Sequence, residues 1–138
     1  MTVLVVDAAS AVRSRLVSRL REAGLDVIGE ASSISSALEL ARARPPRAIV
    51  VDIELPGHPG LAVIAELKEC CPDAALVVFT NASPYRRACL AAGADGFFIE
   101  THPDPARALS DADTQWPLDQ LEGLVRRAVA IWRTARAA

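Results

Sequence analysis

The sequence predicts an α/β protein built on a doubly wound parallel sheet. Short apolar runs alternate five times with segments of helical length. Runs this short and apolar are typical of strands buried on both faces, and helix-length connections suit parallel pairing. Right-handed crossovers then restrict the topology. A length of 138 residues suits one domain with one core, which we expect to span residues 1–138.

The first half of the chain is expected to form three strands and two helices. The strands are residues 3–6, 25–31 and 48–51. Ser10 can cap a helix that ends at Gly24, because glycine tolerates left-handed dihedral angles. Ser32 or Ser33 can cap a second helix, and the Pro45-Pro46 pair stops it.

The second half is expected to form two strands and three helices. The strands are residues 75–79 and 97–99, and the three apolar residues of the latter suggest burial on both faces. One helix follows the Pro56-Gly57 turn, and Ser83-Pro84 begins another that ends at Gly93. A final helix is expected from Trp116-Pro117 onward, with apolar positions at three and four spacing: Leu118, Leu121, Val125, Ala128 and Trp132.

A polar stretch at about residues 101–116 separates the last strand from the final helix. It is long for a connection between a strand and a helix. Asp104-Pro105 can start a short helical turn over residues 106–109. The chain shows no second domain, internal repeat or low-complexity tail.

The composition is that of an ordinary globular chain with a formal net charge of −2. This charge gives no electrostatic basis for binding nucleic acid or an anionic membrane. Cys70, Cys71 and Cys89 lack the spacing of a zinc site, so we expect reduced cysteines that pack in a cytoplasmic protein. We see neither a signal segment nor an apolar stretch of membrane-spanning length. Lys68 is the only lysine.

Two aspartates end apolar runs. Asp7 follows the first expected strand, and Asp52 follows the third. Open α/β sheets bind ligands at the carboxyl ends of their strands. Two carboxylates at neighbouring strand ends can form an acidic pocket for a cation and a phosphoryl group. A plainer interpretation stays open, in which Asp52 only ends a strand and Asp7 only caps a helix.

With these residues the chain resembles the receiver domain of bacterial two-component response regulators over about residues 2–132. Four segments carry the resemblance, in the right order and spacing: residues 3–7, 51–57, 79–80 and 93–98. The resemblance implies a flavodoxin-like fold with strand order 2-1-3-4-5 and five helices. Residues 79–87 look most like stand-alone receivers without an output domain.

The resemblance also implies roles for individual residues. Asp52 would accept a phosphoryl group from a histidine kinase. Asp7, Asp52 and the backbone carbonyl of Glu54 would hold Mg²⁺. Thr80 and Phe97 would report phosphorylation to the face formed by helix four, strand five and helix five. That face would contact a histidine kinase or another signalling protein, and it could also form a homodimer.

Two residues depart from the family pattern. Ala8 stands where receivers usually carry a second acid that contacts the metal, and Glu100 stands where they usually carry a lysine. Losing one carboxylate should weaken Mg²⁺ binding without abolishing it. An anion in place of a cation should disfavour a phosphorylated Asp52, because phosphoryl transfer depends on charge neutralisation. We therefore expect an atypical receiver with weak or no phosphorylation, which acts through protein contacts.

Two other functions stay open on the sequence. One is a conventional phospho-accepting receiver that tolerates a poor site, and the other is a pseudo-receiver that senses a small ligand in the altered pocket. An enzyme is not expected, since no nucleophile–base pair or glycine-rich phosphate loop occurs. His58 and His102 lack partners at metal-binding spacing and are expected at the surface. Phe97 could simply be a core aromatic.

Overall fold

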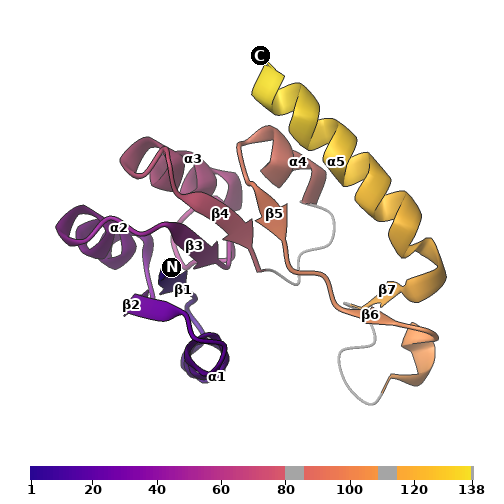
Figure 1. Ribbon diagram of the computed structural model, residues 1–138, viewed down its shortest axis with the longest axis horizontal. Helices are drawn as coiled ribbons and strands as arrows, with labels where there is room; N and C mark the ends of the chain where they lie inside the picture. Colours follow the sequence, from indigo (N-terminus) through magenta and orange to yellow (C-terminus); the bar gives the residue numbers. More distant parts are fainter. Residues whose placement is uncertain (80–85, 109–114, 138) are drawn as a thin grey trace.

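The computed structural model describes residues 1–79, 86–108 and 115–137. Five parallel strands form one sheet with the order β2-β1-β3-β4-β5, so the expected flavodoxin-like topology is confirmed. Figure 1 shows this sheet at the centre of the molecule. Its strands are β1 (Thr2–Val6), β2 (Asp26–Ala31), β3 (Ala48–Val51), β4 (Ala75–Val78) and β5 (Gly96–Phe97).

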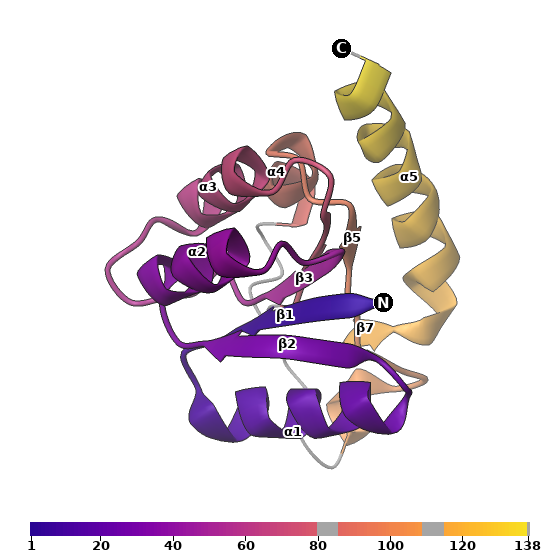
Figure 2. The same ribbon diagram turned by 60° about the vertical axis from the view of Figure 1, so that its left-hand side comes forward.

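Five α-helices connect or follow these strands: α1 (Ser10–Glu22), α2 (Ile34–Ala43), α3 (Gly60–Cys70), α4 (Arg86–Ala91) and α5 (Leu121–Ala137). Helices α2, α3 and α4 lie on one side of the sheet, and α1 lies on the other (Figures 1 and 2). Helix α5 extends beside α4, beyond the β5 edge (Figure 1). Within the described residues, none of the helices is both long and apolar enough to cross a bilayer.

The expected boundaries of α1 and α2 have different outcomes. Ser33 caps α2, because its hydroxyl oxygen accepts a hydrogen bond from the Ser36 N–H at 3.2 Å. Gly24 follows α1 with a φ of +79°, in the left-handed region that glycine favours. Ser10, however, is the first helical residue of α1, and Ala9 occupies the capping position without a side-chain bond. The carboxylate of Asp7 accepts the Ala9 N–H instead.

The core lies mainly between the sheet and the α2–α3 layer, and a smaller cluster lies under α1. Helices α2 and α3 bury their apolar stripes there: Ile34, Ala37, Ala41, Val63, Ile64 and Leu67. Cys71 and Cys89 are buried and Cys70 is half-buried, and all three are free. This agrees with the expectation of packing cysteines.

The edge strand β5 differs from its expected form. It covers only residues 96–97 rather than 97–99, and Phe98 is 50 % exposed. Burial on both faces, expected from three consecutive apolar residues, is therefore wrong for this strand. The Phe98 ring contacts the Phe79 ring, with centroids 4.7 Å apart. Of the described helices, α1 lies on the opposite side of the sheet from α2, α3 and α4 (Figure 2), and Phe79 is half-buried while Phe98 is exposed. The expected Ser83-Pro84 cap lies outside the described residues.

The expected polar loop contains a second, two-stranded sheet. Strand β6 (Thr101–His102) pairs in parallel with β7 (Trp116–Pro117), and the Trp116 N–H donates to the Glu100 carbonyl at 2.8 Å. The short helical turn is a 3₁₀ helix at Pro105–Arg107, slightly earlier than expected. A second 3₁₀ turn, Leu118–Gln120, precedes α5, so the final helix starts at Leu121 rather than at Trp116. The side chain of Trp132 lies outside the described set.

Lys68, the only lysine of the chain, links α3 to the amino edge of the sheet through hydrogen bonds. The Lys68 Nζ atom donates to Asp95 Oδ2 at 2.5 Å and to the Ala74 carbonyl at 2.9 Å. The same carboxylate oxygen accepts the Leu76 N–H at 2.8 Å. The two charged side chains are 21 % and 14 % exposed, so water screens their interaction only in part.

Replacing this lysine should destabilise the fold. Lys68→Met removes the cation and leaves the Asp95 carboxylate partly buried beside Leu76, so we expect a loss of about 2–3 kcal/mol in the free energy of unfolding. Urea denaturation measures it. The matched control is Arg44→Met, which breaks an exposed pair with Asp26 and should cost about 0.5 kcal/mol or less. Equal losses in both variants would contradict the structural role of Lys68.

Candidate phosphoacceptor site

Parallel pairing of β1 and β3 brings Asp7 and Asp52 to the same edge of the sheet. Val6 and Val51 are register partners, and each aspartate directly follows one of them. The Asp52 N–H donates to the Val6 carbonyl at 2.9 Å, and the Asp7 N–H donates to the Ala31 carbonyl at 3.0 Å. Hydrogen bonds to neighbouring strands thus fix the backbone of both aspartates at the carboxyl ends of β1 and β3. The two carboxylates lie close enough for the charge of Asp52 to act on Asp7.

Asp7 is the buried member of the acid pair. It is 3 % exposed, and its Oδ1 atom accepts the Ala9 N–H at 2.7 Å. Burial raises the pKa of Asp7, and the neighbouring Asp52 carboxylate raises it further. The hydrogen bond from Ala9 and the charge of Arg13 oppose this shift and lower the pKa. The two aspartates therefore carry an excess of negative charge, which Arg13 and the Ala9 N–H compensate only in part.

Arg13 is a site residue that the sequence analysis missed. Its Nη1 atom donates to the Asp7 carbonyl at 2.7 Å, and its Nε atom lies 3.6 Å from Glu30 Oε2. The side chain is 18 % exposed. The sequence does show an arginine near the start of the helix that follows Asp7, which could have indicated this role. The contact of Arg13 with Glu30 on β2, however, depends on the fold. Arg13 therefore supplies a positive charge at the β1–β2 side of the pocket.

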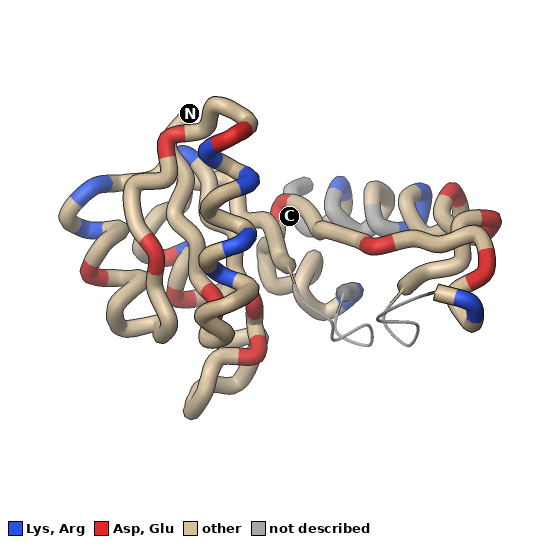
Figure 3. The backbone as a smooth tube through the Cα atoms, turned by 90° about the horizontal axis from the view of Figure 1, so that it is seen from below, with Lys and Arg blue, Asp and Glu red and all other residues tan. Residues whose placement is uncertain are grey.

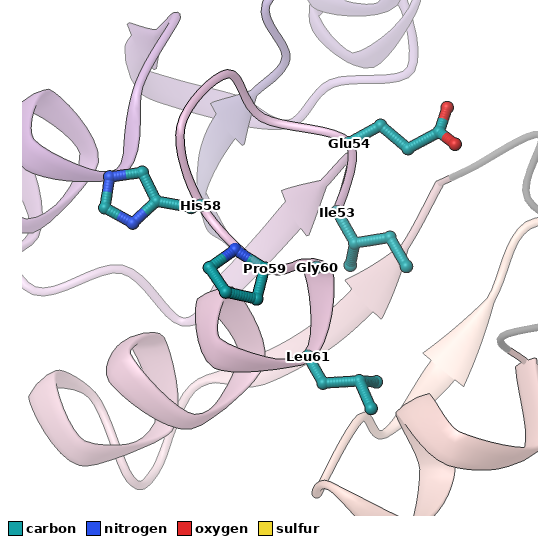
Figure 4. A pocket seen from close by; sticks show the side chains of 6 residues that line it. All are labelled: Ile53, Glu54, His58, Pro59, Gly60 and Leu61. Carbon is teal, nitrogen blue, oxygen red and sulfur yellow. The ribbon is translucent and has the colours of Figure 1, made fainter.

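Asp52 begins the loop that joins β3 to α3. It is half-buried, and its Oδ1 atom accepts the Glu54 N–H at 3.0 Å. Ile53 and Leu55 are buried on either side of Glu54, so the loop is anchored in the core. The Glu54 side chain is exposed and points away from the loop (Figure 4). Because its carboxylate points away, Glu54 can contribute only backbone atoms to the site of Asp7 and Asp52.

A cavity of about 420 Å³ lies along the same loop. It is lined by Ile53, Glu54, His58, Pro59, Gly60 and Leu61. The His58 and Glu54 side chains point in opposite directions (Figure 4), so they do not form a common ligand pair. Among the described residues, no group of three histidine, cysteine or acidic side chains is placed to hold a metal.

The donors that remain suit a weakly held Mg²⁺ ion. Asp7 and Asp52 lie at the same edge of the sheet, and each uses one carboxylate oxygen to accept a backbone N–H. Mg²⁺ takes oxygen ligands and often keeps several waters, so one or two carboxylates suffice. The chemistry of the donor set fits this ion. Asp7, Asp52 and the Glu54 carbonyl would hold it, and it would neutralise charge on an incoming phosphoryl group.

The two departures from the family pattern occupy different surroundings. Ala8 is half-buried and packs against the main core, so a methyl group stands beside the acid pair. Glu100 is exposed and lines a cavity with Arg15 and Arg19 of α1. It lies beyond β5, next to the β6–β7 pair, and no described hydrogen bond or ion pair joins its side chain to Asp52.

The two expected switch residues have different outcomes. Phe97 is half-buried and packs against the main core, which fits its interpretation as a core aromatic. A role in signalling stays a prediction. Thr80 lies outside the described residues.

Comparison with known proteins agrees with this fold. The model of the response regulator receiver domain matches residues 3–105, and the chain belongs to this family. The response regulator TrrA of Thermotoga maritima, solved in complex with Mg²⁺–BeF, is 25 % identical, with a TM-score of 0.65, over 92 % of this chain and 97 % of that one. Receiver domains act in two-component signalling rather than as enzymes.

Curated relatives match shorter parts of this chain. A putative transcriptional regulator of Pseudomonas aeruginosa is 38 % identical over 97 residues, which are 69 % of this chain and 47 % of that protein. A 2-dehydro-3-deoxyphosphooctonate aldolase of Nitratidesulfovibrio vulgaris is 52 % identical over 46 residues, which are 33 % of this chain and 17 % of the aldolase. The chain thus spans less than half the length of these relatives, and their activities are not carried over.

Removing the charge of Asp7 should stabilise the protein at neutral pH. The raised pKa means that the folded state binds this proton more tightly than the unfolded state does, so stability falls as pH rises above the ordinary carboxyl pKa of about 4. Asp7→Asn should therefore raise the melting temperature at pH 7, and the gain should vanish below pH 4 or so. Exposed Asp73→Asn is the control. A variant that melts lower at pH 7 would contradict this assignment.

Restoring the missing acid should strengthen metal binding. Ala8→Asp places a third carboxylate beside Asp7 and Asp52, and we expect Mg²⁺ affinity to rise by about tenfold or more, since this ion selects carboxylate oxygen. Titration calorimetry of the natural chain and the variant measures the change. The isosteric control is Ala8→Asn, which adds similar bulk without charge. Tight binding by the natural chain that neither substitution alters would refute the weak site.

Proposed function

We propose that this receiver is atypical: Asp52 accepts phosphoryl groups weakly or not at all, and the domain signals mainly through protein contacts. The coarse assignment to two-component signalling follows from the family. Four features support the finer proposal. They are the lost second acid at Ala8, the acidic residue at position 100, the location of the only lysine, and the exposed apolar surface around α5.

The location of Lys68 carries the proposal. A phosphorylated aspartate is stabilised by neighbouring cations, and lysine is a common point-charge ligand of phosphate. Here the ammonium group is bound to Asp95 and to the Ala74 carbonyl. Both of these residues precede a strand, so they lie at the amino edge of the sheet, whereas Asp52 follows β3 at the carboxyl edge. The chain has no second lysine to serve Asp52.

The electrostatic consequence is substantial. Two unit charges about 4 Å apart interact with about 4 kcal/mol at an effective dielectric of about 20. A phosphoryl group on Asp52 would lack this stabilisation from lysine. It would also add negative charge beside Asp7, whose ionised form is already disfavoured by burial. Arg13 compensates in part, but its Nη1 is held by the Asp7 carbonyl. The unphosphorylated state is therefore favoured.

The α4–β5–α5 face supports the second half of the proposal. A cavity of about 380 Å³ separates α5 from α4 and β5, with Leu90, Phe97, Ile99, Val125 and Val129 among its lining residues. Val125 and Val129 are 45 % and 39 % exposed. Exposed apolar side chains around a groove are typical of protein contact sites. A histidine kinase or another signalling protein would dock here without requiring a phosphoryl group.

Chemical phosphorylation tests the proposal. With Mg²⁺ and acetyl phosphate, the natural chain should gain little phosphoryl mass by intact mass spectrometry. The double variant Ala8→Asp, Glu100→Lys should be labelled at least tenfold more, because it restores a metal ligand and a cation. Adding Asp52→Asn to the double variant should abolish labelling. If the natural chain is instead labelled rapidly and stoichiometrically at Asp52, it is a conventional receiver.

A further inference from the structure

A groove of about 450 Å³ lies between α1 and the ends of strands β4 and β5. Its apolar wall on α1 is formed by Ala11, Val12 and Leu16, and the rings of Phe79 and Phe98 line it from the strand ends. Val12 and Phe98 are both exposed in the described part of the chain. Exposed apolar side chains around a concave surface favour an apolar ligand, and the volume lies in the range of about 300–1,000 Å³ that is typical of small-molecule sites.

The aromatic side of this groove is held in place by the sheet. The Phe79 N–H donates to the Val51 carbonyl at 2.8 Å. The Phe98 N–H donates to the Val78 carbonyl at 3.0 Å. The two rings contact each other, with centroids 4.7 Å apart and an angle of 44° between their planes. Because the backbones are fixed and the rings are paired, a flat ring can pack against this surface at little cost in conformational entropy.

Two arginines of α1 line the same groove. Arg15 and Arg19 lie one helical turn apart, and both are exposed. Among the described residues, Arg15 forms no ion pair, and Arg19 pairs with the exposed side chain of Glu22 at 3.2 Å. An exposed pair of this kind contributes little, so the guanidinium group of Arg19 is available to a bound anion. Figure 3 shows the arginines of α1 as separate blue segments along the helix.

The charged residues that line the groove suit a ligand with one negative charge. Arg15 and Arg19 supply two positive charges, and Glu100, which follows β5 beyond the carboxyl edge of the sheet, supplies one negative charge. A monoanion therefore neutralises the groove, whereas a polyphosphate or a nucleic acid would exceed its positive charge. Helix α1 begins at the carboxyl edge, and Arg19 lies more than two turns after its start. Repulsion by Glu100 and attraction by Arg19 thus direct an anion away from that edge.

We propose that the α1 groove binds a small planar aromatic carboxylate. The ring of the ligand packs on Phe79 and Phe98, and the apolar side chains of α1 cover its edge. The carboxylate accepts hydrogen bonds from Arg15 and Arg19, since planar guanidinium groups match the geometry of a carboxylate. The groove shares no lining residue with the acid pair or with the cavity between α5, α4 and β5. Binding therefore requires neither metal nor a phosphoryl group, and it stands whether or not Asp52 is phosphorylated.

Titration with 2-naphthoate, followed by protein NMR without metal or phosphodonor, tests the proposal. We expect a dissociation constant on the order of 0.1 mM, which is the scale for a ligand of this size. The neutral 2-naphthalenemethanol and the aliphatic cyclohexanecarboxylate should each bind at least about fivefold more weakly, because one lacks the charge and the other lacks the aromatic ring. Absence of 2-naphthoate binding at about 2 mM overturns the proposal, and so does equal affinity for the three compounds.

Nuclear Overhauser contacts locate the bound ligand. The ring protons of 2-naphthoate should show contacts to the methyl groups of Val12 and Leu16, which line the α1 groove. Contacts to Val125 and Val129 instead, in the cavity beside α4 and β5, would overturn the assignment of the site.

Matched charge variants provide an independent readout. The double variant Arg15→Gln, Arg19→Gln should weaken 2-naphthoate binding about tenfold or more, because both cationic donors are lost. The control is the double variant Arg21→Gln, Arg127→Gln, which removes the same charge outside the groove and should change the affinity less than about twofold. Arg21 lies about 120° or more around α1 from both groove arginines. Equal affinities of the two double variants for 2-naphthoate overturn the inference.

Discussion

The parallel pairing of β1 with β3 is the constraint on which the site depends. Their register makes Val6 and Val51 partners, so the residues that follow them leave the sheet together. Hydrogen bonds from the Asp7 and Asp52 backbones then hold both aspartates at one edge. The flanking apolar residues are almost fully buried, so the backbone cannot shift without exposing the core. Two carboxylates are thereby kept together although burial makes the charge of Asp7 costly.

The scaffold of this receiver and the charges around its acid pair depend on different features of the sequence. Strand order, loop anchoring and the acid pair are those of a phospho-accepting domain, because they are determined by core packing and strand register. The charges around the pocket are determined by single side chains, which can change without disturbing the core. Ala8 packs like any small core residue, and Glu100 sits in solvent beyond β5. A stable fold is therefore weak support for a working phosphorylation site.

Local pattern was sufficient to predict β1 to β4, the Ser33 cap, the Gly24 turn and the Asp7–Asp52 pair, because each follows from neighbouring residues or from parallel topology. Three features could not be predicted in this way. The pair of Lys68 with Asp95, the contact of Arg13 with Glu30 and the pairing of β6 with β7 all join residues distant in sequence. Such contacts depend on how helices are placed on the sheet, which periodicity alone does not specify.

The bond between Lys68 and Asp95 has a further consequence for the surface. Arginine supplies every other positively charged side chain of this protein. With its one lysine amine engaged between α3 and the sheet, the exposed positive charge is guanidinium, which stays protonated at any physiological pH. Lysine acylation, a common way for cells to erase surface charge, has no exposed side-chain target here. The positive charge of the α1 and α5 helices is thus removed neither by acetyl transfer nor by a change of pH within the physiological range.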